Sequence, residues 1–427
     1  RSFNGSGQIC MYSVAFSATP AYSVVHSYDL MGRITSRVEG VLGVTNRYEY
    51  FYDQVGRLIQ VNTNGATYSQ YQYDANGNRT NAVVAGAVSV ADYDAQDRLL
   101  AYGSATYQYN AWGSLTNKSI GGTNTAYRYD TRGSLLEVRE GTNVILYTVD
   151  PMGRRIAKNR NGAVVQRLVY QDFLKPAAEL SAGGSILTYF VYATRANVPD
   201  YIVKTGRTYR VITDHLGSVR LVVDVETGGI AQRLDYDEFG RVLQDTSPGF
   251  QPFGFAGGVY DPDTGLVRFG FRDYEAGIGR WLSKDPVLFR GRQENLYLYC
   301  YGDSINRADP TGLAKSDTCT GELHHWTGPY YYYVDPMSSE AVTPPPSLSI
   351  VGPLPETNIV PLILDNVPVE KPSTFTIYYD LDYGIDPIDG VTSLWPHMRP
   401  LVLAFKTLTG KLTKLDLFGA LFIKIDK

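Results

Sequence analysis

Aromatic and polar residues alternate along most of the chain before residue 313. In Tyr48-Glu49-Tyr50 and Tyr127-Arg128-Tyr129, two rings fall on one face of an extended strand and the residue between them on the other. Similar alternation continues from Val164 to Val223, except at Lys175–Ile186, which we predict to be a loop. This period of two predicts half-buried β-strands.

A short phrase recurs between these stretches. It consists of Tyr-Asp, two further residues, Gly, then Arg or a small polar residue, and an aliphatic residue; Tyr28–Ile34, Tyr52–Leu58 and Tyr236–Val242 are complete copies. The Asp side chain can cap a turn, and Gly supplies the positive φ that the turn needs. Because the aliphatic residue then starts a returning strand, each repeat is expected to be a β-hairpin.

The phrase defines an internal repeat of about twenty residues. Its Asp or Asn stands at positions 29, 53, 74, 94, 110, 130 and 150. A single hairpin cannot bury one face in water, whereas stacked neighbours can. The repeat therefore predicts an all-β fold in which hairpins wind into one continuous sheet.

The composition agrees with a β structure. The chain has 34 Tyr and 42 Gly, and only 19% of its residues are charged. The formal net charge is −4, and the part after residue 313 has 8 Lys and Arg against 13 Asp and Glu. Neither part has the basic excess of a protein that binds phosphates, so the shell is not expected to bind nucleic acid.

Cysteines and apolar runs give little further guidance. Cys10, Cys300 and Cys319 form no CxxC motif and no even-numbered framework, so disulfides are not expected to organise the fold. The apolar stretch Leu417–Ile423 is too short to span a membrane. The chain begins with Arg1 partway through a repeat-like region, and we interpret it as a fragment.

The most specific motifs lie between residues 260 and 313. They are Tyr260-Asp261-Pro262-Asp263-Thr264-Gly265-Leu266, Phe271-Arg272-Asp273-Tyr274, Gly279-Arg280-Trp281-Leu282-Ser283-Lys284-Asp285-Pro286, Asn295-Leu296-Tyr297-Leu298-Tyr299 and Asp309-Pro310-Thr311-Gly312-Leu313. Their order resembles the Rhs-associated core domain of Rhs/YD-repeat proteins, a family related to toxin-complex C components and teneurins. The upstream repeats and Asp214–Arg220 also resemble this family, so the resemblance covers residues 20–313. Asp303-Ser304 departs from the usual Asn-Pro and should alter a turn.

The resemblance implies a large hollow shell, or cocoon, whose core domain is an aspartyl autoprotease that cuts after the DPxGL motif. Residues 1–250 would form the YD-repeat shell, residues 251–313 the core that closes it, and residues 314–427 a variable cargo or toxin segment. Asp273 and Asp285 match the catalytic carboxylate pair, and Arg272 matches the arginine beside the first. The cleavage site would comprise Asp309, Pro310, Gly312, Leu313 and Ala314, with the cut after Leu313.

Elementary chemistry agrees with this assignment. Peptide hydrolysis by aspartates needs two carboxylates that share a proton, and like charges held close push their pKa values apart. A hairpin turning at Gly279 could bring Asp273 and Asp285 together. The alternative is that both are turn caps, as aspartates in β proteins often are. Trp281 and His215 are interpreted as structural residues.

The segment from Ala314 onward differs in composition from the repeats and contains 13 of the 22 prolines. His324-His325-Trp326 could serve a metal or nuclease-like site but more simply forms a polar loop, since no matching ligand spacing is present after it. The oxygen-bearing residues of Asp380–Asp389 alternate as in a calcium loop, but the twelfth-position Glu of an EF-hand is missing. We therefore predict neither a metal site nor a cofactor.

The leading hypothesis is a shell that cuts itself once and releases its C-terminal segment. Expected partners are this segment inside the shell, a secretion or injection apparatus and an immunity protein, and the expected location is secreted or at the cell surface, as a delivered bacterial effector. One alternative is a non-enzymatic scaffold that binds glycans or proteins. Another makes residues 314–427 an enzyme toxin.

Overall fold

The structure is a computed structural model that describes residues 1–291 and 293–313, together with five strands between residues 376 and 415. The chain divides into two compact units, Arg1–Trp326 and Thr327–Lys427. The domain boundary predicted at residue 313 stays a prediction.

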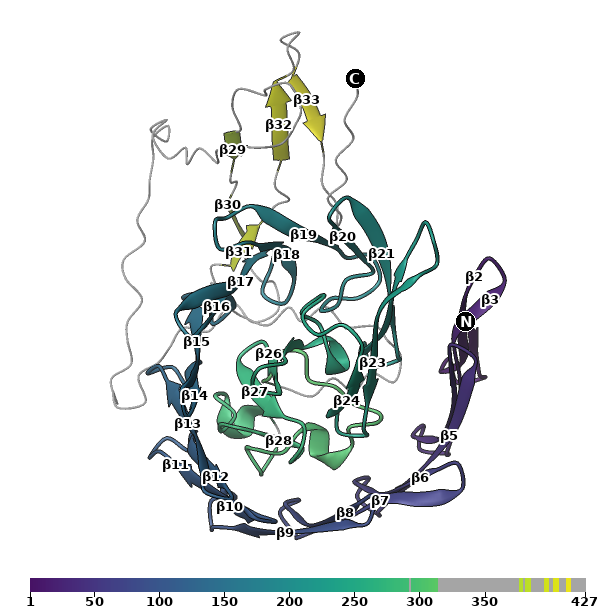
Figure 1. Cartoon of the computed structure of the whole chain (residues 1–427), viewed down its shortest axis with the longest axis vertical. Helices are drawn as coiled ribbons and strands as arrows, with labels where there is room; N and C mark the ends of the chain where they lie inside the picture. Colours follow the sequence, from purple (N-terminus) through teal and green to yellow (C-terminus); the bar gives the residue numbers. More distant parts are fainter. Residues whose placement is uncertain are drawn as a thin grey trace. The chain divides into compact units, whose positions relative to one another are not determined.

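The first unit contains one antiparallel sheet of 24 strands in which most sequence neighbours pair. Figure 1 shows this sheet curving around the segment that comes after it in the chain. The predicted all-β repeat shell is confirmed. Its strands are β1 (Ser2–Phe3), β2 (Ile9–Phe16), β3 (Thr19–Tyr28), β4 (Ile34–Val41), β5 (Val44–Tyr52), β6 (Leu58–Thr63), β7 (Ala66–Tyr73), β8 (Arg79–Val84), β9 (Ala87–Tyr93), β10 (Leu99–Tyr102), β11 (Ala105–Tyr109), β12 (Leu115–Ile120), β13 (Thr123–Tyr129), β14 (Leu135–Glu140), β15 (Asn143–Val149), β16 (Arg155–Arg160), β17 (Ala163–Tyr170), β18 (Pro176–Leu180), β19 (Ile186–Val191), β20 (Tyr201–Lys204), β21 (Arg207–Thr213), β22 (Val219–Asp224), β23 (Ile230–Tyr236) and β24 (Val242–Asp245).

The Tyr-Asp phrase forms the predicted turn between strands. In the turn that joins β3 to β4, Asp29 Oδ1 accepts hydrogen bonds from the backbone N–H groups of Met31 and Arg33, at 3.0 and 2.9 Å. The guanidinium of Arg33 binds Asp29 Oδ2 at 2.8 Å, and Gly32 has a φ of +79°. One aspartate thus fixes both the backbone and the arginine of its own turn.

A tyrosine hydroxyl connects several of the turns to the previous repeat. Tyr28 donates to the carbonyl of Ile9 at 2.7 Å, and Tyr73 donates to the carbonyl of Leu58 at 2.8 Å. The turn arginine adds a second connection, because the guanidinium of Arg57 lies 4.9 Å from the ring centre of Tyr73. The same hydroxyl bond recurs from Tyr52 to Ile34, Tyr93 to Arg79, Tyr170 to Arg155 and Tyr192 to Pro176.

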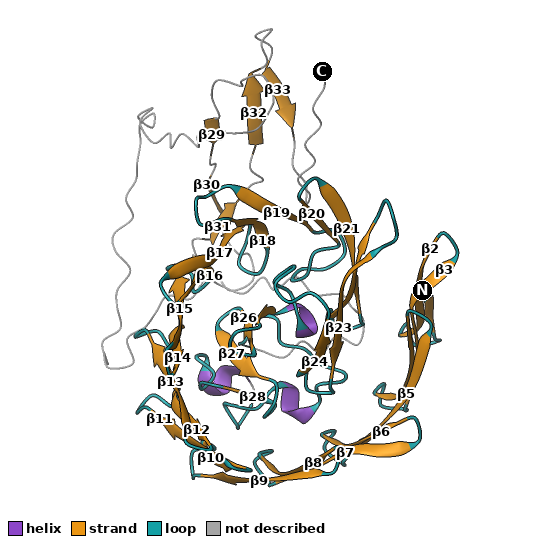
Figure 2. Cartoon of the chain, in the orientation of Figure 1, coloured by secondary structure: helices purple, strands orange, loops and turns teal. Residues whose placement is uncertain are grey.

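The segment from residue 251 to 313 folds as a small sheet with short turns of helix. Its aromatic centre packs tightly: Tyr274, Trp281 and Tyr299 are all at most 2% exposed, with ring centres 4.5 to 5.7 Å apart. In the described residues, helix occurs only in this segment, inside the curve of the large sheet (Figure 2). The elements are β25 (Val259–Asp261), β26 (Leu266–Phe269), β27 (Arg272–Glu275), β28 (Arg280–Trp281) and the 3-10 helices η1 (Phe255–Gly257), η2 (Leu288–Gly291) and η3 (Cys300–Gly302).

The loop predicted at Lys175–Ile186 is wrong in part. Its first half contains β18, which pairs with both β17 and β19. Pro176 takes the first position of this strand, where a missing N–H is tolerated, and Ala178 is buried beneath its neighbours. The remainder, Ser181–Ser185, is the turn that joins β18 to β19.

The second unit contains five described strands in two small antiparallel sheets. β29, β32 and β33 form one sheet, and β30 pairs with β31 in the other. The strands are β29 (Thr376–Tyr378), β30 (Leu381–Gly384), β31 (Trp395–Met398), β32 (Val402–Lys406) and β33 (Leu412–Leu415).

If the hydroxyl bonds hold the repeats in register, removing one should weaken the shell without opening a cavity. Tyr73→Phe is expected to lower the free energy of unfolding by about 1 kcal/mol, the usual net contribution of a hydrogen bond. Tyr189→Phe is the matched control, because Tyr189 is 47% exposed. Denaturant unfolding measures both, and equal effects of the two substitutions would contradict this role of the hydroxyl.

Candidate functional site

The candidate residues lie on and after a hairpin formed by β27 and β28. These strands pair through Tyr274 with Trp281 and Glu275 with Arg280, and Gly279 has a φ of +67° in the turn. The hairpin predicted from the Gly279 turn therefore forms. Asp273 lies on β27, and Asp285 comes after the end of β28.

Asp273 is buried between two arginines. Arg155 of β16 donates to its Oδ1 at 2.8 Å, and Arg268 of β26 donates to its Oδ2 at 2.7 Å. The side chains of both arginines are only 4% exposed. Both oxygens of Asp273 are thus held by charge-assisted hydrogen bonds, one of which comes from the shell.

Asp285 has a different environment. Its Oδ2 lies 2.8 Å from Arg272 Nη2, and its Oδ1 accepts a hydrogen bond from the backbone N–H of Val287 at 2.9 Å. The pKa of Asp285 is raised to about 6, chiefly by burial; Arg272 and the N–H of Val287 oppose this shift, and the charge of Asp309 supports it. Asp285 therefore keeps its proton at a higher pH than an ordinary aspartate.

Arg272 connects Asp285 to the cleavage motif. Its Nη2 also lies 3.3 Å from Asp309 Oδ2, and its Nε donates to the carbonyl oxygen of Gly312. The guanidinium lies 4.1 Å from the ring centre of Trp281. A buried arginine, 2% exposed, thus binds two carboxylates and the backbone of the segment that is predicted to be cut.

The cleavage motif docks closely against the backbone of the β26–β27 turn. The N–H of Phe271 donates to the carbonyl of Thr311 at 2.9 Å. A Cβ at Gly312 would lie 2.4 Å from the carbonyl oxygen of Phe269, and a Cβ at Gly270 would lie 2.3 Å from that of Thr311. Glycine at both positions allows the two backbones to meet.

The residues of the motif have distinct surroundings. Asp309 Oδ1 accepts hydrogen bonds from the Thr311 hydroxyl and from the backbone N–H groups of Gly312 and Leu313, at 3.0, 2.9 and 3.3 Å. Pro310 and Leu313 are half-buried. Ala314, on the far side of the predicted cut, lies outside the described residues.

The structure brings together some of the predicted site residues. Arg272, Asp285 and Asp309 meet at one guanidinium, whereas Asp273 is bound by a separate pair of arginines. Trp281 is buried in the core as expected, and it also stacks on Arg272.

The remaining interpretations rest on individual contacts or lie outside the described residues. His215 has a structural contact, because its Nε2 lies 2.7 Å from the carbonyl oxygen of Ile305. Among the metal-ligand candidates of the C-terminal segment, Asp382 lies in β30. His324–Trp326, Asp380, Asp386 and Asp389 lie outside the described residues.

Sequence reasoning missed the arginines that bind Asp273. Arg155 belongs to an ordinary-looking repeat strand, 118 residues before Asp273 in the chain. Arg268 lies five residues before Asp273, directly opposite it in the β26–β27 pair. A pairing of β26 with β27 could have suggested Arg268, but no local signal pointed to Arg155.

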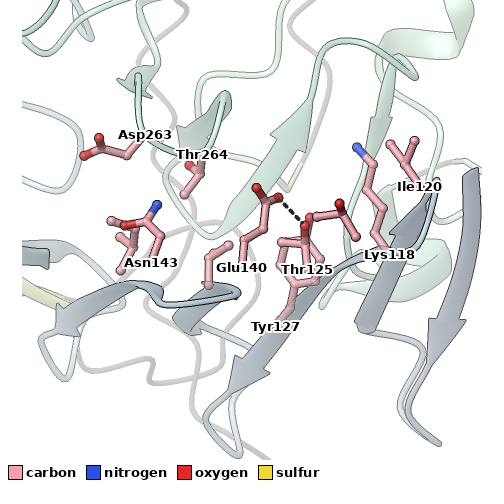
Figure 3. A pocket seen from close by; sticks show the side chains of 11 residues that line it. Lys118, Ile120, Thr125, Tyr127, Glu140, Asn143, Asp263 and Thr264 are labelled. Atoms are coloured by element: carbon pink, nitrogen blue, oxygen red, sulfur yellow. Dashed lines mark hydrogen bonds between the residues drawn. The ribbon is translucent and has the colours of Figure 1, made fainter. Parts of the chain in front are cut away.

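A separate concave site, which includes none of these candidate residues, lies against the shell strands (Figure 3). It has a volume of about 160 Å³ and is lined by β12 to β15 and by the turn at Asp263 and Thr264. Its charged side chains already have partners: Glu140 accepts from the Thr125 hydroxyl at 2.8 Å, and Asp263 lies 3.1 Å from Arg160. These contacts favour no particular ligand.

A metal site needs several ligand side chains close together, and a membrane-spanning helix needs a long run of apolar residues. Within the part of the chain that the structure describes, no group of three or more His, Cys, Asp or Glu side chains is placed to hold a metal ion. None of the helices in that part has the length and apolar character required to cross a membrane.

The fold and the repeated turn define a class of protein, the β-hairpin repeat shells with a short core segment inside the curve of the sheet. The teneurin YD-shell family model matches residues 1–307. The chain belongs to this family, as the resemblance of its repeats implied.

Curated relatives match the same region. Teneurin-1 of Gallus gallus is 30% identical over 298 residues, which cover 67% of this chain and 11% of that protein. Double-stranded DNA deaminase toxin A of Burkholderia cenocepacia (strain H111) is 28% identical over 358 residues, covering 74% of this chain and 22% of the toxin. The chain thus spans about a tenth of the length of the teneurins that it matches.

Solved structures of toxin complexes show a distant likeness. The crystal structure of TcdB2-TccC3-Cdc42 matches with 18% identity and a TM-score of 0.37, over 71% of this chain and 21% of that one. The Photorhabdus luminescens Tc holotoxin pore matches with 17% identity and a TM-score of 0.36, over 72% and 21% of the two chains.

Docking of the cleavage motif should depend on the missing side chain of Gly312. In Gly312→Ala, the methyl group would collide with the carbonyl of Phe269, so the bond from Phe271 N–H to Thr311 should open. We expect hydrogen exchange at Phe271 to become at least about tenfold faster, measured by mass spectrometry. Gly265→Ala is the control, because Gly265 has a similar φ of +71° but no atoms near its Cβ position. Equal exchange in both variants would refute the docking contact.

Proposed function

We propose that this YD-repeat shell cuts its own chain once, between Leu313 and Ala314, and frees the C-terminal segment. The observation that carries the proposal is the convergence on Arg272, which binds the carboxylate of Asp285 and the backbone of the cleavage motif at Gly312. Substrate segment and candidate acid are thereby held by one side chain. Such positioning is a large part of the rate enhancement in hydrolysis.

The proposed step balances as a simple hydrolysis. Water adds to the carbonyl carbon of Leu313, and a carboxylate accepts its proton. Asp285 gives its own proton to the nitrogen of Ala314 as the C–N bond breaks. With Asp285 as the acid, we assign the water-activating role to the other member of the pair, Asp273, which would exchange one arginine contact for the attacking water.

The wider biology is inferred from the relatives and belongs to the proposal. We infer that the shell encloses residues 314–427 and acts outside the cell or at its surface, since one relative is named as a toxin and others are teneurins. In this proposal, a bacterial secretion apparatus delivers the protein, and an immunity protein neutralises the C-terminal segment. The alternative of a non-enzymatic scaffold has the same fold and predicts an intact chain.

The cut is tested by intact mass spectrometry of the full chain during incubation. The parent should yield a fragment that begins at Ala314, whereas Asp273→Asn and Asp285→Asn should slow the cut at least about a hundredfold. Asp261→Asn is a matched control, because Asp261 is buried in the same small sheet but accepts from Tyr147 at 2.5 Å and binds Lys158. Near-ultraviolet circular dichroism checks that each variant is folded.

Two results would overturn this proposal. If the folded parent stays whole, the motifs are structural in this chain and the scaffold hypothesis takes its place. If the two aspartate variants cut at the rate of the parent, another site performs the chemistry.

The rate of the cut should fall with rising pH. Burial raises the pKa of Asp285 to about 6, so its neutral, proton-donating form dominates below that pH and disappears above it. The rate constant is expected to decrease up to about tenfold per pH unit above pH 6. Fragment formation measured between pH 4.5 and 8 checks this, and a rate that rises across this range would exclude Asp285 as the acid.

A further inference from the structure

The shared contact at Arg272 Nη2 suggests a role for Asp309 beyond marking the cut. Asp285 Oδ2 lies 2.8 Å and Asp309 Oδ2 lies 3.3 Å from this one nitrogen. All three side chains are buried, with at most 7% of each exposed. Two carboxylates therefore face one positive charge in a site that water screens poorly.

Two negative charges at one guanidinium repel each other, so one of the carboxylates tends to keep a proton. The hydrogen bonds indicate which one. Asp309 Oδ1 receives three donors, namely the Thr311 hydroxyl and the N–H groups of Gly312 and Leu313, and such donors stabilise a charged carboxylate. The Oδ1 of Asp285 receives the N–H of Val287. The proton therefore belongs on Asp285.

We propose that Asp309, an aspartate of the cleavage motif itself, is a positioning residue that holds the proton on Asp285 through their shared contact with Arg272. The segment to be cut thereby completes the acid that cuts it. This inference rests on the self-cleavage proposed above. It also gives a source of specificity, since a peptide without an aspartate at this place would leave Asp285 more readily ionised.

The electrostatic balance agrees with this arrangement. Burial is the main cause of the raised pKa of Asp285, and the charge of Asp309 acts in the same direction against the opposing charge of Arg272. Removing the charge of Asp309 while keeping its shape should therefore lower the pKa of Asp285 and leave the docked motif in place.

Asp309→Asn is suited to this test, because its amide oxygen can keep the three hydrogen bonds that Oδ1 accepts. We expect the pH at which the cut slows to move roughly one unit lower than in the parent, with the cut still after Leu313. Asp303→Asn is the matched control. Asp303 is a buried aspartate of the same segment, bound to Asn306 at 2.8 Å and 3.8 Å from Arg307, and its substitution should leave the pH profile unchanged.

A direct titration of Asp285 keeps the inference testable if Asp309→Asn does not cut. In chains with 13C-labelled aspartate carboxyls, the Asp285 signal is the one lost in Asp285→Asn. The pH at the midpoint of this signal's titration should be lower in Asp309→Asn than in the parent. If neither the titration midpoint nor the pH at which the cut slows differs between the two chains, the role of Asp309 is overturned. If the parent chain stays whole at every pH, the self-cleavage proposal fails instead. The titration alone then decides whether Asp309 influences the proton on Asp285.

Discussion

The hydrogen bond from a tyrosine hydroxyl to a carbonyl of the preceding repeat is the interaction on which this shell depends. A β-hairpin turn fixes only its own two strands, and a winding sheet also needs a fixed relation between one hairpin and the next. Tyr73 provides it by donating to Leu58, and Arg57 reinforces it by stacking on the same ring. The Asp of the phrase orders the turn, and the Tyr joins that turn to its neighbour.

The site in the core depends on this regularity. Arg155 stands on β16 and binds Asp273, and Lys158 of the same strand binds Asp261. Arg280 of β28 in turn donates to Asn78, which belongs to a turn of the shell, at 2.7 Å. Ion pairs this deeply buried cost desolvation energy and tolerate little misplacement. A shift of the shell register would therefore displace the core carboxylates, so shell and site form one cooperative structure.

The sequence was most informative where structure is local. The turns, the hairpins and the β27–β28 pair are all determined by a few neighbouring residues, and each was predicted with its glycine and aspartate. β18 was missed because Pro176 and small alanines look like a loop until a neighbouring strand covers them. Arg155, the partner of Asp273 from the shell, could not be predicted, since this contact depends on how far the sheet has curved over 118 residues.

The contacts around Arg272 also determine the state of the site after the proposed cut. Arg272 binds Gly312 and Asp309, and Phe271 binds Thr311; all three partners lie before the bond between Leu313 and Ala314. Hydrolysis removes none of these contacts, because the new chain end remains joined to the shell through Asp309. A second peptide would have to displace a covalently attached segment from a buried site. Under the proposed mechanism, each chain therefore performs a single cut, and the occupied site protects other peptides from cleavage.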